Sequence, residues 1–103
     1  MPGMPTVRTI EIEMPIAVNV SVSESTLSVD LQDGRCISVP VAWYPRLAHG
    51  SAEERDNWSL IGRGVGIHWE DLDEGISTLG LIEGKPSNEG QESFRQWLAA
   101  RRS

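Results

Sequence analysis

Residues 26–40 have the sequence TLSVDLQDGRCISVP, and this stretch decides the fold. Apolar and polar residues alternate on both sides of the Asp33-Gly34 pair, as expected for two half-buried antiparallel strands. A two-residue loop would place the apolar row of one strand opposite the polar row of the other. A three-residue loop, Gln32 to Gly34, instead pairs Val29 with Ile37, so that both apolar rows share a face. We therefore predict a bulged hairpin with Gly34 at positive φ and with Cys36 on the opposite face.

The segment before this hairpin shows the same alternation at Val18, Val20 and Val22. A four-residue turn over residues 23–26 pairs Val22 with Leu27, so the apolar rows again coincide. The pattern thus predicts a three-stranded antiparallel meander with one apolar face. Further upstream, Ile10 and Ile12 alternate with glutamates, which indicates more extended chain, and residues 1–6 resemble a frayed start.

The second half of the chain has no long period-two pattern. Short helices are expected within residues 43–60, where Ser51 and Glu54 have the spacing of a capping box, and over residues 77–82. Residues 61–69 alternate glycine with larger side chains and are expected to return as a short extended segment. The prediction is an α+β fold: an antiparallel meander of three to four strands, covered on one face by short helices.

The chain is expected to comprise an α+β domain over residues 1–84, then a loop and an amphipathic helix over residues 85–103. The helix is predicted from Glu89 to Arg101, with Asn88 as its cap. Its apolar stripe, too hydrophobic to stand alone in water, consists of Phe94, Trp97 and Leu98. The stripe is expected to pack on its own domain or on a second copy in a homodimer, and the sequence leaves both alternatives open.

Composition excludes several classes of protein. The 103 residues suit one domain, and 15 acidic against 9 basic residues give a net charge of −6, which argues against nucleic acid binding. The lone Cys36 excludes a disulfide scaffold and indicates a reducing compartment. No apolar run approaches the ~18 residues of a membrane span, and no signal-peptide pattern is present. We therefore expect a cytoplasmic protein that does not contact a membrane.

His68 and the nearby carboxylates Asp71, Asp73 and Glu74 form the most tempting chemical cluster. One imidazole and two carboxylates could hold a metal, and His68 could act as an acid or base. No pair among them has the spacing of a known metal motif, and the other imidazole, His49, lies at a helix end. We therefore predict a structural His68, packed by Trp69 with a ring nitrogen bonded to backbone. No metal, cofactor or enzymatic activity is expected, with an enzyme centred on His68 as an alternative.

Four tryptophans in a short chain supply large apolar surfaces that serve either a core or an interface. Trp43, Trp58 and Trp69 lie in segments expected to cover the sheet, where a core role is the commoner one. Arg46 and Arg55 are candidates for ion pairs with Glu53, Glu54 or Asp73. Residues 70–92 hold seven acids and one lysine and are the expected docking face for a basic partner. The candidate interaction residues are Trp43, Arg46, Trp69, Glu70, Asp71, Asp73 and Glu74.

A family resemblance rests on several motifs spread over roughly residues 16–84. They are Asp33-Gly34-Arg35, Trp43-Tyr44-Pro45-Arg46-Leu47, Asn57-Trp58, Gly66-Ile67-His68-Trp69 and Leu72-Asp73-Glu74. Together they resemble the bacterial family known as domain of unknown function 2442. One departure is Gly75, where the family pattern leads us to expect an acidic residue.

The resemblance implies a small α+β domain that stands alone or precedes a helix-turn-helix domain. Genes of this family often neighbour a second small protein, so an antitoxin-like or regulatory interaction module is the expected function, with a small protein as partner. A transcriptional regulator that binds DNA is the runner-up. One terminal helix is too little for a helix-turn-helix unit, so DNA binding is not expected without an added domain.

Overall fold

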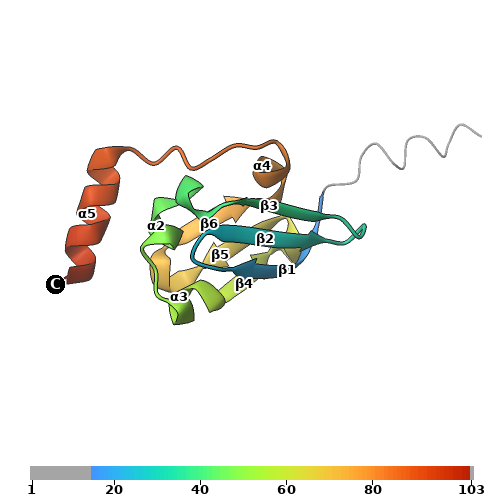
Figure 1. The fold of residues 1–103 in the computed structure, drawn as a ribbon, viewed down its shortest axis with the longest axis horizontal. Coiled ribbons are helices and arrows are strands. Elements are labelled where there is room, and N and C mark those ends of the chain that lie inside the picture. Colours follow the sequence, from blue (N-terminus) through green and yellow to red (C-terminus); the bar gives the residue numbers. More distant parts are fainter. Residues whose placement is uncertain (1–14, 103) are drawn as a thin grey trace, which may run out of the picture.

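The computed structural model describes residues 15–102, which form two three-stranded antiparallel sheets joined by short helices (Figure 1). The first sheet contains β1 (Ala17–Val22), β2 (Thr26–Leu31) and β3 (Cys36–Pro40); the second contains β4 (Trp58–Ile61), β5 (Gly66–Trp69) and β6 (Glu74–Ser77). The helices are η1 (Val41–Trp43), α2 (Pro45–Ala48), α3 (Ala52–Asp56), η2 (Gly62–Gly64), η3 (Glu70–Leu72), α4 (Thr78–Ile82) and α5 (Gln91–Arg102).

The second sheet corrects the expectation of a single meander covered by helices. The α+β class is confirmed, but the segment around Trp58 is strand β4 and not the end of a helix. It pairs with β5, which in turn pairs with β6. Strand β5 lies within residues 61–69, which were expected to be extended, but with four residues in each strand the alternation is too short to predict that the three pair in a separate sheet.

The β2–β3 hairpin has the predicted register. Val29 lies opposite Ile37, and Gly34 has a φ of 97°. The N–H of Leu31 donates to the carbonyl of Arg35 at 2.8 Å, which closes the three-residue loop. Cys36 is exposed on the other face, as predicted. The parity of apolar residues was therefore sufficient to determine the loop length.

The β1–β2 hairpin confirms one part of its prediction and contradicts another. Val22 lies opposite Leu27 as expected, but a bulge between Ala17 and Asn19 turns the start of β1 over. Val18 is consequently 49% exposed, whereas Ala17 is 1% exposed and takes its place in the core. The expectation that Val18 faces inward is therefore wrong. The expected strand at Ile10 and Ile12 and the frayed start at 1–6 lie outside the described residues.

Both sheets contribute to one hydrophobic core, and Figure 1 shows the first sheet in front of the second. Its fully buried large side chains include Leu27, Leu47, Ile67, Trp69 and Leu72. Thr78 is also fully buried, and its hydroxyl donates to the carbonyl of Gly64 at 2.8 Å. This bond joins the start of α4 to the turn between β4 and β5. A buried hydroxyl is tolerated because it is satisfied.

Short helices lie at the end of the core where α2 and α3 meet the β5–β6 turn. The predicted capping box is present: the Ser51 hydroxyl accepts from the Glu54 N–H, and the Ser51 N–H donates to the Glu54 carboxylate. The helix α5 begins at Gln91, two residues later than predicted, so Asn88 is not its cap. Within residues 15–102, no helix is long and apolar enough to cross a membrane.

Candidate functional site

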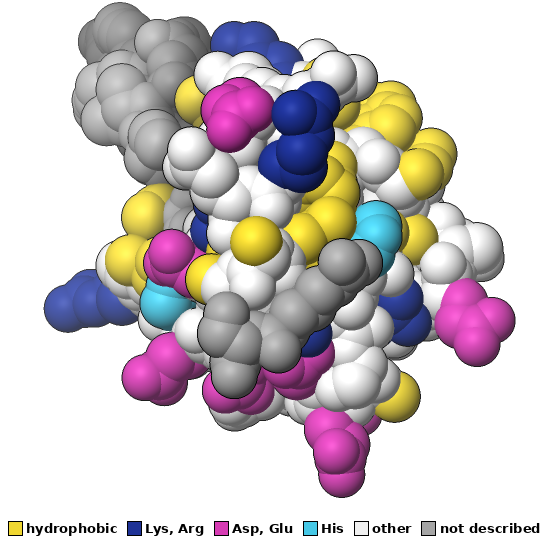
Figure 2. Space-filling model, turned by 90° about the vertical axis from the view of Figure 1, so that its left-hand side faces the viewer, with side chains coloured by type: hydrophobic (Ala, Val, Ile, Leu, Met, Phe, Trp, Pro, Cys, Tyr) yellow, Lys and Arg dark blue, Asp and Glu magenta, His cyan; other side chains and the backbone are white. Residues whose placement is uncertain are grey.

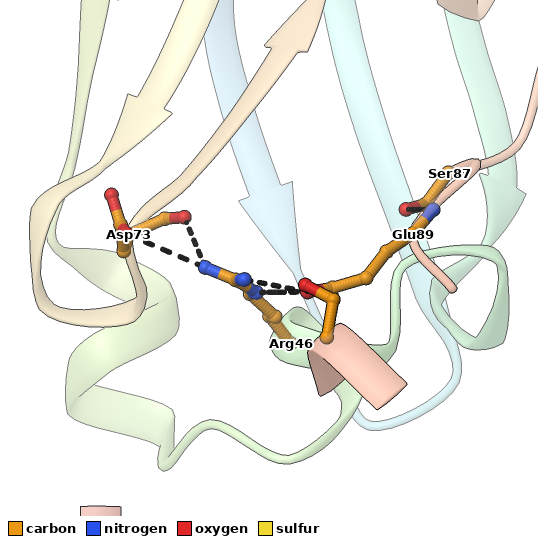
Figure 3. A network of polar contacts seen from close by, with 5 residues as sticks. Arg46, Asp73, Ser87 and Glu89 are labelled. Atoms are coloured by element: carbon orange, nitrogen blue, oxygen red, sulfur yellow. Dashed lines mark hydrogen bonds and ion pairs between the residues drawn. The ribbon is translucent and has the colours of Figure 1, made fainter. Parts of the chain in front are cut away.

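Arg46 of α2 joins three segments of the chain at the end of the molecule where α5 lies (Figure 3). Its Nη2 lies 2.5 Å from Oε2 of Glu89, and its Nε donates to Oε1 of Glu89 at 2.9 Å. Its Nη1 donates to the backbone carbonyl of Asp73 at 2.8 Å and lies 3.5 Å from the carboxylate of Asp73. We call Arg46, Asp73, Glu74 and Glu89 the Arg46 junction.

The ion pair between Arg46 and Glu89 is shielded from solvent, because the two side chains are only 16% and 10% exposed. The hydrogen bond from Arg46 holds the pKa of the Glu89 carboxyl below its usual range, and the same bond raises the pKa of Arg46. Glu89 also accepts from the hydroxyl of Ser93 in the first turn of α5. The junction therefore connects α2 directly to the beginning of α5.

Residues 70–74, which we call the acidic turn, connect β5 to β6. Leu72 is fully buried and anchors the turn, while Glu70, Asp71 and Asp73 are exposed. Asp73 has a left-handed backbone, with a φ of 51°, and its N–H donates to the carbonyl of Glu70. The Asn57 amide donates to the Asp71 carboxylate at 2.9 Å. These contacts and the Arg46 bond to the Asp73 carbonyl hold the backbone of the turn, and the Asn57 bond also holds the carboxylate of Asp71.

Glu74 differs from the other acids of the turn because it points toward the core side of the sheet. It lies directly opposite Trp69 and two residues from Ile76, and both of these side chains are buried on that face. Burial raises the pKa of Glu74 to about 7; Arg46 opposes this rise, while Glu89 and Asp73 add to it. Within residues 15–102 its carboxylate makes no hydrogen bond and no ion pair.

A groove of about 250 Å³ runs beside Glu74, between β6 and the returning chain. Sequence reasoning missed this groove and missed Glu89 as the main partner of Arg46. The half-burial of Glu74 had a signal, since Glu74 and Ile76 are two residues apart in an extended stretch. Glu89 had none, because it is separated from Arg46 by 43 residues in a segment with the composition of a linker.

The two tryptophans among the predicted contact residues have different environments. Trp69 is fully buried, and its Nε1 donates to the carbonyl of Arg55 at 2.9 Å, so its side chain belongs to the core and is not available to a partner. Trp43 is half-buried, and its backbone carbonyl accepts from the N–H of Ser87. Of the two, only Trp43 therefore keeps an accessible surface, three residues before Arg46 in the chain.

The predicted ion pairs are confirmed for Arg46 and not for Arg55. Arg46 pairs with Asp73 as expected. Arg55 instead donates to the carbonyls of Leu47 and Ala48, at 2.9 and 2.8 Å, where it satisfies backbone groups at the end of α2. Its expected partner Glu54 pairs with Arg101 of α5 at 2.8 Å.

The apolar stripe of α5 packs on its own domain in the single chain, which is one of the two predicted alternatives. Trp97 contacts the core and lies between the guanidinium groups of Arg46 and Arg101, 5.3 and 4.8 Å from its ring centroid. Phe94 stacks on Trp97 and meets the His49 ring edge-on at 5.1 Å. Leu98 is half-buried beside them.

In the described part of the chain, the carboxylates near His68 in the sequence do not form a metal-binding group with its ring. The strand alternation turns its half-buried ring away from Trp69, toward the face where Gly75 lies opposite. Within the described part of the chain, its ring makes no hydrogen bond, so the predicted buried bond to backbone is wrong. Residues 15–102 contain no group of three His, Cys, Asp or Glu side chains that could hold a metal. His49 instead contacts the Pro45 carbonyl through Nδ1 at 3.2 Å.

Comparison with known proteins identifies relatives of unknown function. Residues 17–87 match the family model described as "Protein of unknown function (DUF2442)". A crystal structure of a protein of unknown function from Rhodospirillum rubrum is similar at 28% identity and a TM-score of 0.64, covering 75% of this chain and 95% of that one. An uncharacterized protein from Chromobacterium violaceum shares the fold at 18% identity and a TM-score of 0.63, covering 93% and 83%. No curated protein matches the chain.

Proposed function

This chain belongs to the DUF2442 family, whose members have no known function, and from its acidic turn we propose that it is a non-catalytic module that binds a basic partner protein. The observation that carries the proposal is a turn with a backbone held by Arg46 and by the buried Leu72, which exposes the carboxylates of residues 70, 71 and 73. A loop already held in one conformation loses little entropy on binding.

Charge supports a basic partner. Residues 70–92 hold seven acidic residues against one lysine. Figure 2, which faces the end of the molecule where α5 lies, shows acidic side chains gathered along the lower part of this face. Complementary charge steers association and disfavours acidic partners, including nucleic acids. The resemblance to a family whose genes neighbour a second small protein favours an antitoxin-like or regulatory role, with that small protein as the partner.

Charge reversal on the acidic turn tests the proposal. The tagged chain is expressed in its native host with the neighbouring gene intact, and co-purifying protein is identified. A Glu70→Lys, Asp71→Lys double variant should lose the partner by at least about tenfold. The matched control is Asp30→Lys, which reverses an exposed charge on β2 outside the acidic turn and should retain the partner. Equal loss in both variants would contradict the proposed docking face.

DNA binding and catalysis are the alternative functions, and each predicts a different experimental result. A DNA mobility shift that weakens steeply with salt would favour a transcriptional regulator. An activity abolished by His68→Gln in a stable fold would favour an enzyme. The proposal is contradicted if either result appears while no protein partner is retained.

A further inference from the structure

The groove beside Glu74 has two walls that are held in place. One wall is the strand β6, and the other is the chain over residues 85–88. Three hydrogen bonds fix the second wall: Tyr44 Oη donates to the carbonyl of Lys85, the N–H of Lys85 donates to the carbonyl of Gly80, and the N–H of Ser87 donates to that of Trp43. The position of the groove is therefore determined by contacts within the fold.

Its volume of about 250 Å³ limits what it can accept. Sites for cofactors and drug-sized ligands typically occupy roughly 300–1,000 Å³, so this groove suits a single side chain or a similar small group. Ile76 and Pro86 line it with apolar surface, while Glu74 is the one carboxylate among the lining residues. The long side chains of lysine and arginine combine an apolar stem with a charged head in this way.

The charge around the groove is negative overall. Arg46 already binds Glu89 and Asp73, and the Arg46 junction contains one positive charge and three carboxylates. Glu74 keeps no hydrogen-bonding partner within residues 15–102. A half-buried carboxylate without a donor gains more from a cation than an exposed one does, because less water screens the interaction.

We propose that this groove binds the cationic head of a lysine or arginine side chain from the partner protein, with the head at Glu74 and the stem along Ile76 and Pro86. That the side chain comes from a partner protein rests on the proposed function. That the bound group is a cation with an apolar stem rests on the groove alone. The protein's own Lys85 does not fill the site, since its Nζ pairs with Glu83 at 2.9 Å and its side chain is 71% exposed.

The proposal implies a dependence on pH. The groups that face Glu74 are Arg46, Asp73, Glu89 and Tyr44, and Lys85 lines the same groove. Burial raises the pKa of Glu74 to about 7, so the carboxyl is largely protonated at pH 6 and largely ionised at pH 8. A cation binds the ionised form, and binding should therefore strengthen from pH 6 to pH 8.

The test is an NMR titration of the full chain with N-acetyl-lysine N-methylamide, which imitates one lysine side chain. The matched probe is the norleucine analogue, which has no charge. The lysine probe should shift the amides of Gly75, Ile76 and Ser77, more strongly at pH 8, while the norleucine probe should not. The substitution Glu74→Gln should lower the affinity for the lysine probe by about tenfold. Asp30→Asn, an exposed change on β2 outside the acidic turn, should leave binding of the lysine probe unchanged.

Three outcomes would overturn the proposal. The first two are equal shifts with both probes and unchanged binding of the lysine probe in Glu74→Gln. The third is that the lysine probe shifts no resonance of the parent protein, while the Lys85→Met substitution itself shifts the Glu74 resonance. The last result would show that the chain's own lysine occupies the groove in solution. Failure here is distinguishable from failure of the proposed function. Charge reversal of Glu70 and Asp71 tests the docking of the partner independently of this groove.

Discussion

Arg46 and Glu89, 43 residues apart in the sequence, form a two-point ion pair that is largely shielded from water. Glu89 also accepts from Ser93, so the same carboxylate holds both α2 and the first turn of α5. The family model ends at residue 87, just before this carboxylate. The pair therefore attaches a helix that lies beyond the shared domain to a residue within that domain.

Removing Arg46 should destabilise the protein. Arg46→Ala leaves Glu89 half-buried without its partner, and we expect the free energy of unfolding to fall by about 2 kcal/mol. Urea denaturation measures the change. The control is Arg95→Ala, which removes an exposed pair with Glu92 and should change stability by less than about 0.5 kcal/mol. Equal losses in the two variants would show that the Arg46 pair contributes no more than a surface contact.

Trp97 should hold α5 on the domain. Trp97→Ala removes a half-buried ring between two guanidinium groups, and we expect hydrogen-exchange protection of residues 91–102 to fall while β2 keeps its protection. Gln96→Ala, an exposed change on the same helix, should alter neither. Sedimentation provides a second measurement. A mass of two chains that falls to one in Trp97→Ala would show that α5 instead joins two copies.

Glu74 should make stability depend on pH in a direction opposite to most acids. Its pKa in the fold is about 7, above the usual value of 4.5, so the folded protein binds more protons than the unfolded chain between these values. Stability from this group is therefore present below pH 4.5 and decreases as pH rises through 7. Glu54 and Glu89, whose pKa values are lowered, act in the opposite sense below pH 4.5.

Glu74→Gln isolates this contribution. The variant should match the parent protein at pH 5 and be more stable at pH 8 by about 1–2 kcal/mol, a figure reduced for the partial exposure of the side chain. Urea denaturation of both proteins between pH 5 and pH 8 gives the difference. A stability difference that stays constant with pH would mean that Glu74 titrates normally in the fold.

Gly64 should be irreplaceable at its close contact with β1. It has a φ of 110°, and a Cβ there would collide with the carbonyl oxygen of Ala17. Gly64→Ala should cost about 3 kcal/mol or more, as judged by thermal and urea unfolding. Gly84→Ala is the matched control, because Gly84 also has positive φ but nothing within 4 Å of its Cβ position. It should cost about 1 kcal/mol, from backbone strain alone. A similar cost at both positions would mean that the collision is relieved.

The first sheet was predictable because its information is local. Alternation and turn parity determine the pairing of Val29 with Ile37 and of Val22 with Leu27. The bulge that exposes Val18 was not predictable in this way, because it occurs where Gly64, far along the chain, approaches Ala17. The second sheet was missed for a related reason. Although residues 61–69 were expected to be extended, the strands of this sheet are too short for a period to indicate their pairing, which depends on the assembled structure.

The candidate site was predictable only in part. The acidic character of residues 70–74 followed from composition, and Asp73 was one of three acidic residues offered as a partner of Arg46 on the basis of charge. The burial of Trp69, the inward direction of Glu74 and the role of Glu89 depend on which strands pair and where the returning chain passes. Local patterns carry no information about these long-range contacts.

The bulge in β1 also bears on how copies of this protein avoid joining edge to edge. Among residues 15–102, β1 and β3 are the outer strands of the first sheet, and an outer strand offers unpaired backbone groups to a strand of another molecule. The bulge between Ala17 and Asn19 breaks the regular ladder on one side, and Pro40, which has no N–H to donate, ends the strand on the other. Both outer strands thus carry a feature that discourages edge-to-edge pairing and growth into fibrils.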